Sequence, residues 1–312
     1  MTTTSAIHTI ISTVEKAFLG NRDAVELAVC TFLSGGHLLI EDMPGVGKTT
    51  MAKAMAAAFG GQFSRIQFTS DLLPSDILGI SVWNRNTSAF EFQKGPIFAN
   101  IILADEINRA SPKTQSALLE AMSERQVSQD GTTYALHAPF MVIATQNANE
   151  SFGTYPLPES QLDRFTMRLQ LGYATGEIEK KIIRAGGEFQ PSSVGQAISE
   201  KELTAVVHDV ENTHVDESIL EYVMAIVKKT RDANRLNFGA SPRGSIALVK
   251  CAKAYARIRG RDYVLVDDIQ KLAVPVVAHR LVGKTDSVYT GGQVTSAETL
   301  LRQLVQSIDV PV

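Results

Sequence analysis

The sequence is poor in cysteine, and its two cysteines, Cys30 and Cys251, form no CxxC pair. This usage argues against a disulfide-stapled fold and is typical of a reducing compartment, so we expect a cytoplasmic protein. The six histidines show no ligand spacing such as HExxH, so we expect no zinc site. No apolar run approaches the roughly 18–20 residues of a membrane-spanning helix, and the first residues lack the basic-then-apolar order of a signal peptide. We therefore expect no membrane insertion.

An excess of charge of either sign is also missing. Thirty Lys and Arg residues against 33 Asp and Glu residues give a net charge of −3 at pH 7, which argues against general affinity for nucleic acid or anionic membranes. Hydrophobic residues make up 44% of the 312 residues and charged residues 20%. This is the profile of a globular protein long enough for about two domains.

Short apolar runs alternate with helical spacing in the first half of the chain. Strands are predicted at 37–41, 64–68, 99–104, 140–145 and 166–171, and helices at 7–18, 24–33, 48–59, 112–124 and within 158–164. Several strands are continuously apolar, which favours a parallel sheet covered by helices on both faces. Residues 80–92 and 126–136 each predict an inserted β-hairpin, the second around the turn dipeptide Asp130-Gly131.

The pattern changes from about residue 176. Helices are predicted at 177–185, 200–211, 218–233, 241–259 and 267–281, with no strand among them. We therefore predict two domains, an α/β domain at 1–174 and an all-helical domain at 175–312.

A glycine-containing loop follows the first strand and leads into a helix. It comprises Pro44, Gly45, Val46, Gly47, Lys48, Thr49 and Thr50. The glycines let successive backbone N–H groups turn toward a polyphosphate, and the helix N-terminus adds its positive end. We expect Lys48 to reach the β- and γ-phosphates and the Thr49 hydroxyl to bind Mg²⁺. ATP and Mg²⁺ are therefore the predicted ligands of this P-loop.

One position departs from the general P-loop pattern GxxxxGK[ST]. Asp42 stands where the pattern has its first glycine. Since Asp adopts a positive φ more readily than most residues, we expect the turn to form nevertheless.

Two acids end the apolar strand at 99–104. The carboxyl ends of parallel strands meet at one edge of the sheet, so Asp105 and Glu106 should lie beside the phosphate loop. We expect Asp105 to hold Mg²⁺, through water, and Glu106 to polarise the attacking water.

Three segments of the chain carry a family resemblance. ADEINRASPKTQSALLEAM at 104–122, LPESQLDRF at 157–165 and GASPRGS at 239–245 closely resemble the MoxR family of AAA+ ATPases, which also has the Asp42 form of the loop. The resemblance covers residues 14 to about 281. It implies an AAA+ P-loop core, in which helices flank a five-stranded parallel sheet with two inserted hairpins, followed by an all-helical lid.

The resemblance also implies roles for three further residues. Asn147 matches the sensor-1 residue that orients the attacking water, Arg164 the arginine finger, and Arg243 the sensor-2 residue that contacts the γ-phosphate from the lid. It further implies a ring oligomer, expected to be a hexamer, and chaperone-like remodelling or maturation of client proteins. A partner with a von Willebrand factor A domain is a further implication.

Geometry supports a role for Arg164 in a neighbouring subunit. This residue precedes the predicted strand 166–171, whereas nucleotide lies beyond the carboxyl ends, roughly 17–20 Å away at about 3.3 Å per residue. The alternative is a structural ion pair of Arg164 with Asp163 or Glu159.

Two other functions stay open. A nucleic-acid motor needs basic residues at a hairpin tip to grip phosphates. Residues 126–136 contain none and include Asp130, although Arg85 lies in the first insert. A nucleotide-dependent assembly switch with little turnover is disfavoured by the pair Asp105-Glu106. The roles of Arg109 and of both hairpins toward clients also stay open, because the aromatic residues of the first hairpin suit cross-strand packing as well as partner binding.

Overall fold

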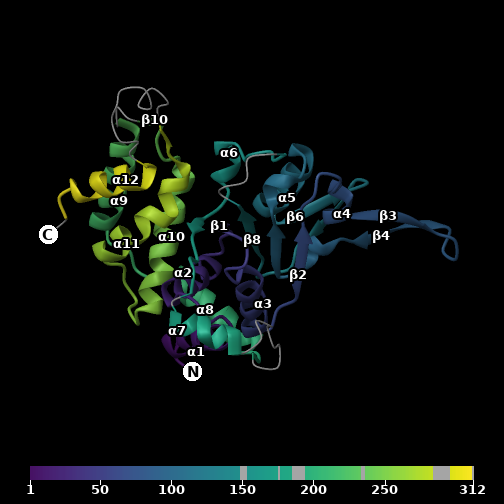
Figure 1. Ribbon diagram of the computed structural model, residues 1–312, viewed down its shortest axis with the longest axis horizontal. Helices are drawn as coiled ribbons and strands as arrows, with labels where there is room; N and C mark the ends of the chain where they lie inside the picture. The colour runs from purple at the N-terminus through teal and green to yellow at the C-terminus, as the bar shows by residue number, and fades with distance from the viewer. Residues whose placement is uncertain (148–152, 175, 185–193, 233–235, 284–295, 311–312) are drawn as a thin grey trace.

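The computed structural model describes residues 1–147, 153–174, 176–184, 194–232, 236–283 and 296–310. Its centre is a parallel five-stranded sheet with the order β2-β5-β8-β1-β9 (Figure 1). The strands are β1 (Leu38–Glu41), β2 (Phe63–Gln67), β5 (Ile101–Asp105), β8 (Met141–Gln146) and β9 (Met167–Leu169). All five predicted strands are confirmed.

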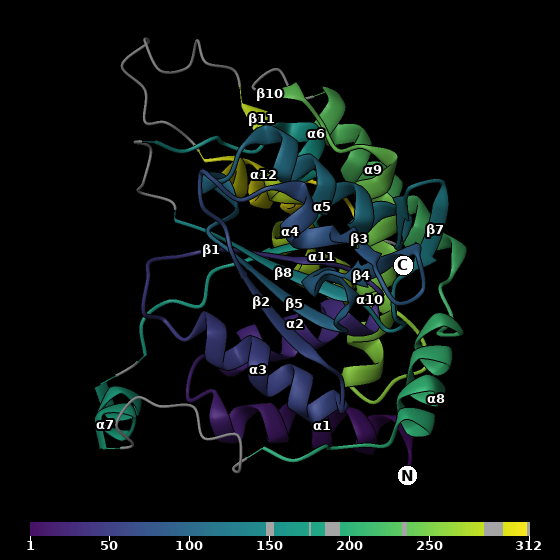
Figure 2. The same cartoon turned by 90° about the vertical axis from the view of Figure 1, so that its right-hand side faces the viewer.

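Both faces of the sheet are buried. Along β1, Leu38 and Ile40 belong to one hydrophobic cluster and Leu39 to another. The first cluster includes α1 (Thr3–Ala17), α2 (Arg22–Leu33) and α3 (Lys48–Phe59), and the second includes α4 (Pro74–Leu78) and α5 (Pro112–Glu124). Figure 2 shows α1 and α3 on one side of the sheet and α4 and α5 on the other. The continuously apolar strands are thus explained by helices on both faces.

Both predicted hairpins are present. The first joins β3 (Gly79–Asn84) to β4 (Ala89–Lys94), and in Figure 1 it projects from the body. The second joins β6 (Gln126–Gln129) to β7 (Thr132–Ala135), with Asp130 and Gly131 at positive φ as their turn requires.

Aromatic contacts organise these hairpins. Trp83 and Phe90 meet edge to face across the first hairpin, with ring centroids 5.2 Å apart. At its base, Phe92 stacks on Tyr134 of the second hairpin at 4.3 Å. Cross-strand packing is therefore confirmed for Trp83 and Phe90, whereas Phe92 packs between the two hairpins, and a role of these residues toward partners stays open.

Helices dominate the chain after β9. They are α7 (Gly176–Arg184), α8 (Glu200–Glu211), α9 (Glu217–Asp232), α10 (Pro242–Ile258), α11 (Val266–Val277) and α12 (Ala297–Gln306), with a 3₁₀ turn at Ala278–Arg280. A short helix, α6 (Glu159–Leu162), precedes β9, as predicted. The expectation of no strand in this half is wrong at one place, because β10 (Leu236–Phe238) pairs with β11 (Val282–Gly283). Strands of two or three residues are too short to show the alternation of apolar and polar residues by which a strand is predicted.

The two halves share one hydrophobic cluster. It runs from α1 and α2 into α8 and α10 without a break. Cys30 of α2 and Cys251 of α10 are both buried there, and the Cys30 thiol donates to the Cys251 carbonyl at 3.2 Å. Both cysteines thus serve as small buried residues between the halves. Within the described ranges, no helix combines the length and the apolar character needed to cross a bilayer.

Candidate nucleotide-binding site

A cavity of about 790 Å³ opens at the carboxyl edge of the sheet. It brings together most of the predicted site residues: Pro44, Gly45, Val46, Gly47, Lys48, Thr49, Thr50, Asp105, Glu106 and Asn147. β1 and β5 flank β8 in the sheet, so the segments that follow these three strands converge here.

The loop before α3 has the backbone form that a phosphate cradle requires. Gly45 and Gly47 have φ of 87° and 91°, a region open to glycine at little cost. Gly47 caps α3 without a side-chain hydrogen bond, so the first N–H groups of the helix stay available to an anion. A Cβ at Gly47 would also approach the Phe18 ring to 3.0 Å.

Lys48 lies over this loop. Its Nζ donates to the Asp42 carbonyl at 2.5 Å. Burial lowers the pKa of Lys48, while the negative charges of Asp42, Asp105 and Glu106 act in the opposite direction. Lys48 lines the cavity, where added phosphate charge would stabilise its ammonium.

The structure corrects the explanation offered for Asp42. Its φ is not positive. Instead one carboxylate oxygen accepts from the N–H groups of Leu171 and Gly172, both at 2.7 Å, and the other accepts from Met43 N–H at 2.9 Å. Asp42 thus ties the start of the phosphate loop to the chain leaving β9.

Thr145, near the end of β8, connects the two acids. Its Oγ1 donates to the Asp105 carboxylate at 2.6 Å and accepts from the Glu106 N–H at 2.9 Å. Thr145 is buried, whereas Glu106 has the left-handed backbone with φ 57° and ψ 48°. This conformation is costly for a residue other than glycine, and such outliers concentrate at functional sites.

Side chains from neighbouring elements contact the acids as well. Arg65 of β2 pairs with Asp105 at 2.6 Å. Gln67 at the end of β2 donates to the Glu106 carboxylate at 3.0 Å, and Arg109 pairs with the same carboxylate at 3.0 Å. Arg109 thus contacts Glu106 within its own subunit, and its role toward clients stays open.

The donors near the loop fit Mg²⁺ that arrives with nucleotide. In the described parts of the chain, no group of three or more His, Cys, Asp or Glu side chains could hold a metal by itself. The cavity instead offers the hydroxyl of Thr49 and the carboxylate of Asp105. Mg²⁺ is commonly held in this way, by one or two protein oxygens together with phosphate and water.

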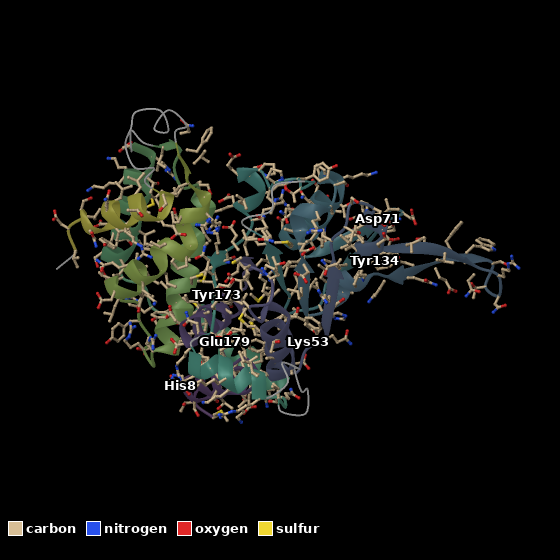
Figure 3. All side chains as sticks on the ribbon, viewed as in Figure 1. His8, Lys53, Asp71, Tyr134, Tyr173 and Glu179 are labelled. Carbon is tan, nitrogen blue, oxygen red and sulfur yellow. The ribbon has the colours of Figure 1, made fainter. Side chains whose placement is uncertain are left out.

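The other end of the cavity was not predicted. Phe18, Leu19, Gly20 and Asn21, from the connection between α1 and α2, line it together with Tyr173, Ala174, Ile182 and Ile183. Figure 3 labels Tyr173 and Glu179, which border the cavity from the chain after β9 and from α7. This apolar end is suited to a planar base, and no motif in the sequence marks it.

Arg164 lies outside the cavity of its own subunit. Its Nη1 donates to the Leu119 carbonyl at 2.8 Å and to Ser123 Oγ at 2.7 Å, both on α5. The alternative ion pair of Arg164 with Asp163 or Glu159 is not formed in this structure, where Asp163 pairs with Arg280. The predicted separation from the phosphate loop therefore agrees with the structure.

Arg243 is likewise not brought to this cavity. It is exposed at the second position of α10. Ser241, which caps this helix, donates to both Asp163 carboxylate oxygens at 3.0 Å and so holds the start of α10 beside the residues before β9. Arg243 does not line this cavity, and its contact with the γ-phosphate stays a prediction.

Comparison with known proteins identifies the family. Residues 37–167 match the ATPase family associated with various cellular activities (AAA), and residues 228–300 match the AAA lid domain. The chain is 47% identical to the uncharacterized protein YeaC of Bacillus subtilis over 96% of this chain and 93% of that protein. It is 39% identical to Chaperone MoxR1 of Mycobacterium tuberculosis over 98% of this chain and 83% of that protein. The chain belongs to the MoxR family of AAA ATPases.

The structural comparison agrees with this assignment. A crystal structure of a candidate ATPase from Cytophaga hutchinsonii superposes with a TM-score of 0.91 and 36% sequence identity, covering 99% of this chain and 96% of that one. As a MoxR-family ATPase, the protein hydrolyses ATP with an AAA+ α/β core and a helical lid.

Sequence reasoning missed three polar residues of this MoxR-family site: Arg65, Gln67 and Thr145. Each lies at or near the carboxyl end of a strand beside β5. The sequence does show a polar residue at or near the end of each of these strands. Such a residue can be assigned to the site only when the order of the strands in the sheet is known.

Proposed function

We propose that the protein couples Mg²⁺-dependent ATP hydrolysis to the remodelling or maturation of client proteins, as a ring of identical subunits. The observation that carries the proposal is the convergence of the phosphate loop, Asp105, Glu106 and Asn147 on one cavity. This is the set of groups needed to bind a triphosphate, hold its metal and direct water at its terminal phosphorus.

Each side chain has a place in the reaction. Lys48, which donates to the Asp42 carbonyl in this structure, exchanges that bond for phosphate oxygens when nucleotide binds. Glu106 polarises the attacking water, and Asn147 orients it. Bound by Thr49 and Asp105, Mg²⁺ would supply positive charge to the phosphate oxygens. These groups act mainly through position and charge, as phosphoryl transfer requires.

Further positive charge for the cavity is assigned to a neighbouring subunit. Arg164 and Arg243 both lie outside their own cavity, and a guanidinium supplied by a partner is an established means of stabilising the transition state. A head-to-tail interface that repeats around a closed ring presents these residues to the next cavity. We propose a hexamer, the state that the resemblance implies.

Exposed apolar side chains support such an interface. Tyr173 and Ile183 line the cavity and are 75% and 71% exposed, and Met43, which Tyr173 contacts, is 42% exposed. Near Arg243 in the chain, Phe238 and Ile246 are 68% and 56% exposed. Large apolar residues exposed at two separate places suit a heterologous contact between copies.

The client role rests on relatives. A Mycobacterium tuberculosis relative bears the name Chaperone MoxR1, and we propose a chaperone-like role for this chain as well. We also propose a partner with a von Willebrand factor A domain. The same proposal includes a domain boundary at 174/175 and a cytoplasmic location.

Replacing Glu106 by Gln tests the proposed chemistry. The variant should bind ATP as the wild type does and lose at least about 100-fold in turnover, because general-base catalysis contributes on that order. Turnover should also vanish when Mg²⁺ is chelated. Glu120→Gln, an exposed carboxylate on α5, is the matched control. Unchanged turnover in the Glu106 variant removes this residue from the mechanism.

The same variant separates client remodelling from movement on nucleic acid. Held in its ATP-bound state, Glu106→Gln should retain client proteins during purification from cells. A rate of wild-type hydrolysis that rises several-fold with single- or double-stranded DNA at about 0.1 M salt would instead favour the motor, with Arg85 as its contact.

A further inference from the structure

Arg280, in the lid, makes a buried contact that the chemistry above does not use. Its side chain is 2% exposed and follows α11 in the 3₁₀ turn Ala278–Arg280. Nη1 donates to the Asp163 carboxylate and, at 2.7 Å, to the Asp163 carbonyl. Nη2 donates to the Phe165 carbonyl at 2.6 Å, and Nε to the Val276 carbonyl at 2.9 Å. The guanidinium therefore uses all three nitrogens, and two of them hold the residues on either side of Arg164.

Two further lid groups hold the same segment. Ser241 Oγ donates to both Asp163 carboxylate oxygens at 3.0 Å. The His279 ring, through Nε2, lies 3.0 Å from the Phe165 carbonyl. Residues 163–165 are thus fixed by the start of α10 and by the end of α11, while Arg164 between them extends to α5.

The backbone of α10 packs closely against the Arg280 side chain. A Cβ at Gly244, in the first turn of α10, would come within 3.2 Å of Arg280 Cδ. Burying a charged side chain is costly unless its hydrogen bonds are satisfied. Arg280 therefore has a single well-determined position, and the groups it binds are determined with it.

This contact fixes two arginines relative to each other. Arg164 follows Asp163 directly, and Arg243 lies two residues after Ser241. We propose that Arg280 is a positioning residue that joins Arg164 and Arg243 into one rigid unit, so that a movement of the lid displaces both arginines together at the neighbouring subunit's nucleotide. The inference rests on the proposed action of Arg164 between subunits.

Mixed rings test the inference. Arg280→Met is produced together with Glu106→Gln, each with its own tag, and rings that carry both tags are purified. The Met variant keeps its phosphate loop and Glu106, and the Gln variant keeps its arginines. Rings of Arg280→Met alone should lose at least about 10-fold in kcat, because small misplacements of a catalytic group carry costs of that order. Affinity for an ATP analogue should stay within about threefold of wild type, and mixed rings should regain turnover.

Regained turnover separates positioning from a structural defect. A misfolded Arg280 variant has no competent cavity for a neighbour to complete, so mixing would restore nothing. Asp163→Asn keeps the size of the side chain and removes its charge, and we expect the same results from it as from Arg280→Met. If the Met variant fails to bind nucleotide, the Asn variant tests the positioning role instead. Arg261→Met is the matched control, because it breaks the buried pair with Asp268 (2.9 and 2.7 Å) inside the lid without touching residues 163–165.

Rings that mix Arg164→Ala with Glu106→Gln separate two claims: that Arg164 acts between subunits, and that Arg280 positions it. If these rings regain turnover and the Arg280 and Asp163 variants do not, Arg280 has no positioning role. If the Arg280 variant alone keeps turnover within about twofold of wild type, the inference is also wrong. If the Arg164 mixture stays inactive, the action between subunits fails, and this inference fails with it.

Discussion

At the scale of single residues, the site depends on polar side chains that serve two partners at once. Asp42 joins the phosphate loop to the chain after β9, and Thr145 joins Asp105 to the Glu106 backbone. Lys48, Asp105 and Glu106 were predicted because fixed spacing follows a recognisable strand. The role of Thr145 could not be predicted, because its partners, Asp105 and Glu106, lie at the end of β5 and directly after it. The pairing of β5 with β8 is a property of the folded sheet.

Thr145→Val should lower kcat by about 10- to 100-fold and leave the ATP affinity within about threefold, because the hydroxyl is engaged by Asp105 and the Glu106 N–H and holds the two acids in place. Steady-state and binding measurements on the same preparation check this split. Thr145→Ser retains the hydroxyl and is the control. A Val variant with normal kcat would show that the two acids keep their positions without this residue.

Asp42→Gly brings the loop closer to the general P-loop pattern, yet it should be harmful. The N–H groups of Leu171 and Gly172 lose their acceptor, and we expect the free energy of unfolding to fall by about 1–3 kcal/mol. Denaturant unfolding measures this loss. Asp42→Asn, which keeps an acceptor oxygen, should lose less. A Gly variant as stable as wild type contradicts the tie between the loop and β9.

At the scale of elements, regular segments were predictable and irregular contacts were not. The bounds of α3, α5 and α8 agree with the prediction because capping residues, apolar spacing and chain breaks coincide there. The apolar end of the cavity lies on the α1–α2 connection and on α7, which are far apart in sequence. Their meeting depends on tertiary packing that local patterns do not encode.

Two buried histidines join elements and make stability depend on pH. His37 accepts from Val142 N–H of β8 and contacts the Met122 carbonyl of α5 at 3.1 Å, and His279 joins the lid to Phe165. Burial lowers the pKa of His37 to about 4 and that of His279 to about 3, with repulsion from nearby arginines adding to both shifts.

Stability should therefore fall as the pH decreases from about 6.5 toward 4. In this range the unfolded chain binds protons that the folded histidines do not, so each buried histidine contributes a slope of up to about 1.4 kcal/mol per pH unit. Unfolding free energies at about pH 7.5 and about pH 5 measure it, and the difference should shrink in His37→Gln and in His279→Gln. The exposed His208, changed in the same way, controls for the substitution. Equal pH dependence in wild type and both variants contradicts the assignment.

At the scale of the whole molecule, one fact organises the account: the cavity and the arginines expected to serve it lie at different places. Asp163, Arg280 and Ser241 hold Arg164 and Arg243 together near the amino end of β9, whereas the phosphate loop follows the carboxyl end of β1. The sequence already indicated this separation for Arg164. For Arg243 it did not, because the position of the lid follows from the buried contacts between the two halves.

The central claim is that hydrolysis in one subunit requires Arg164 of the next. The most direct measurement is the ATPase rate of doubly tagged rings that contain Arg164→Ala and Glu106→Gln subunits in equal amounts, beside rings of each variant alone. Each variant alone should be inactive. In mixed rings half of the cavities keep Glu106 and half of these face an intact Arg164, so about one quarter of the wild-type rate should return. Mixed rings as inactive as either parent would contradict the account.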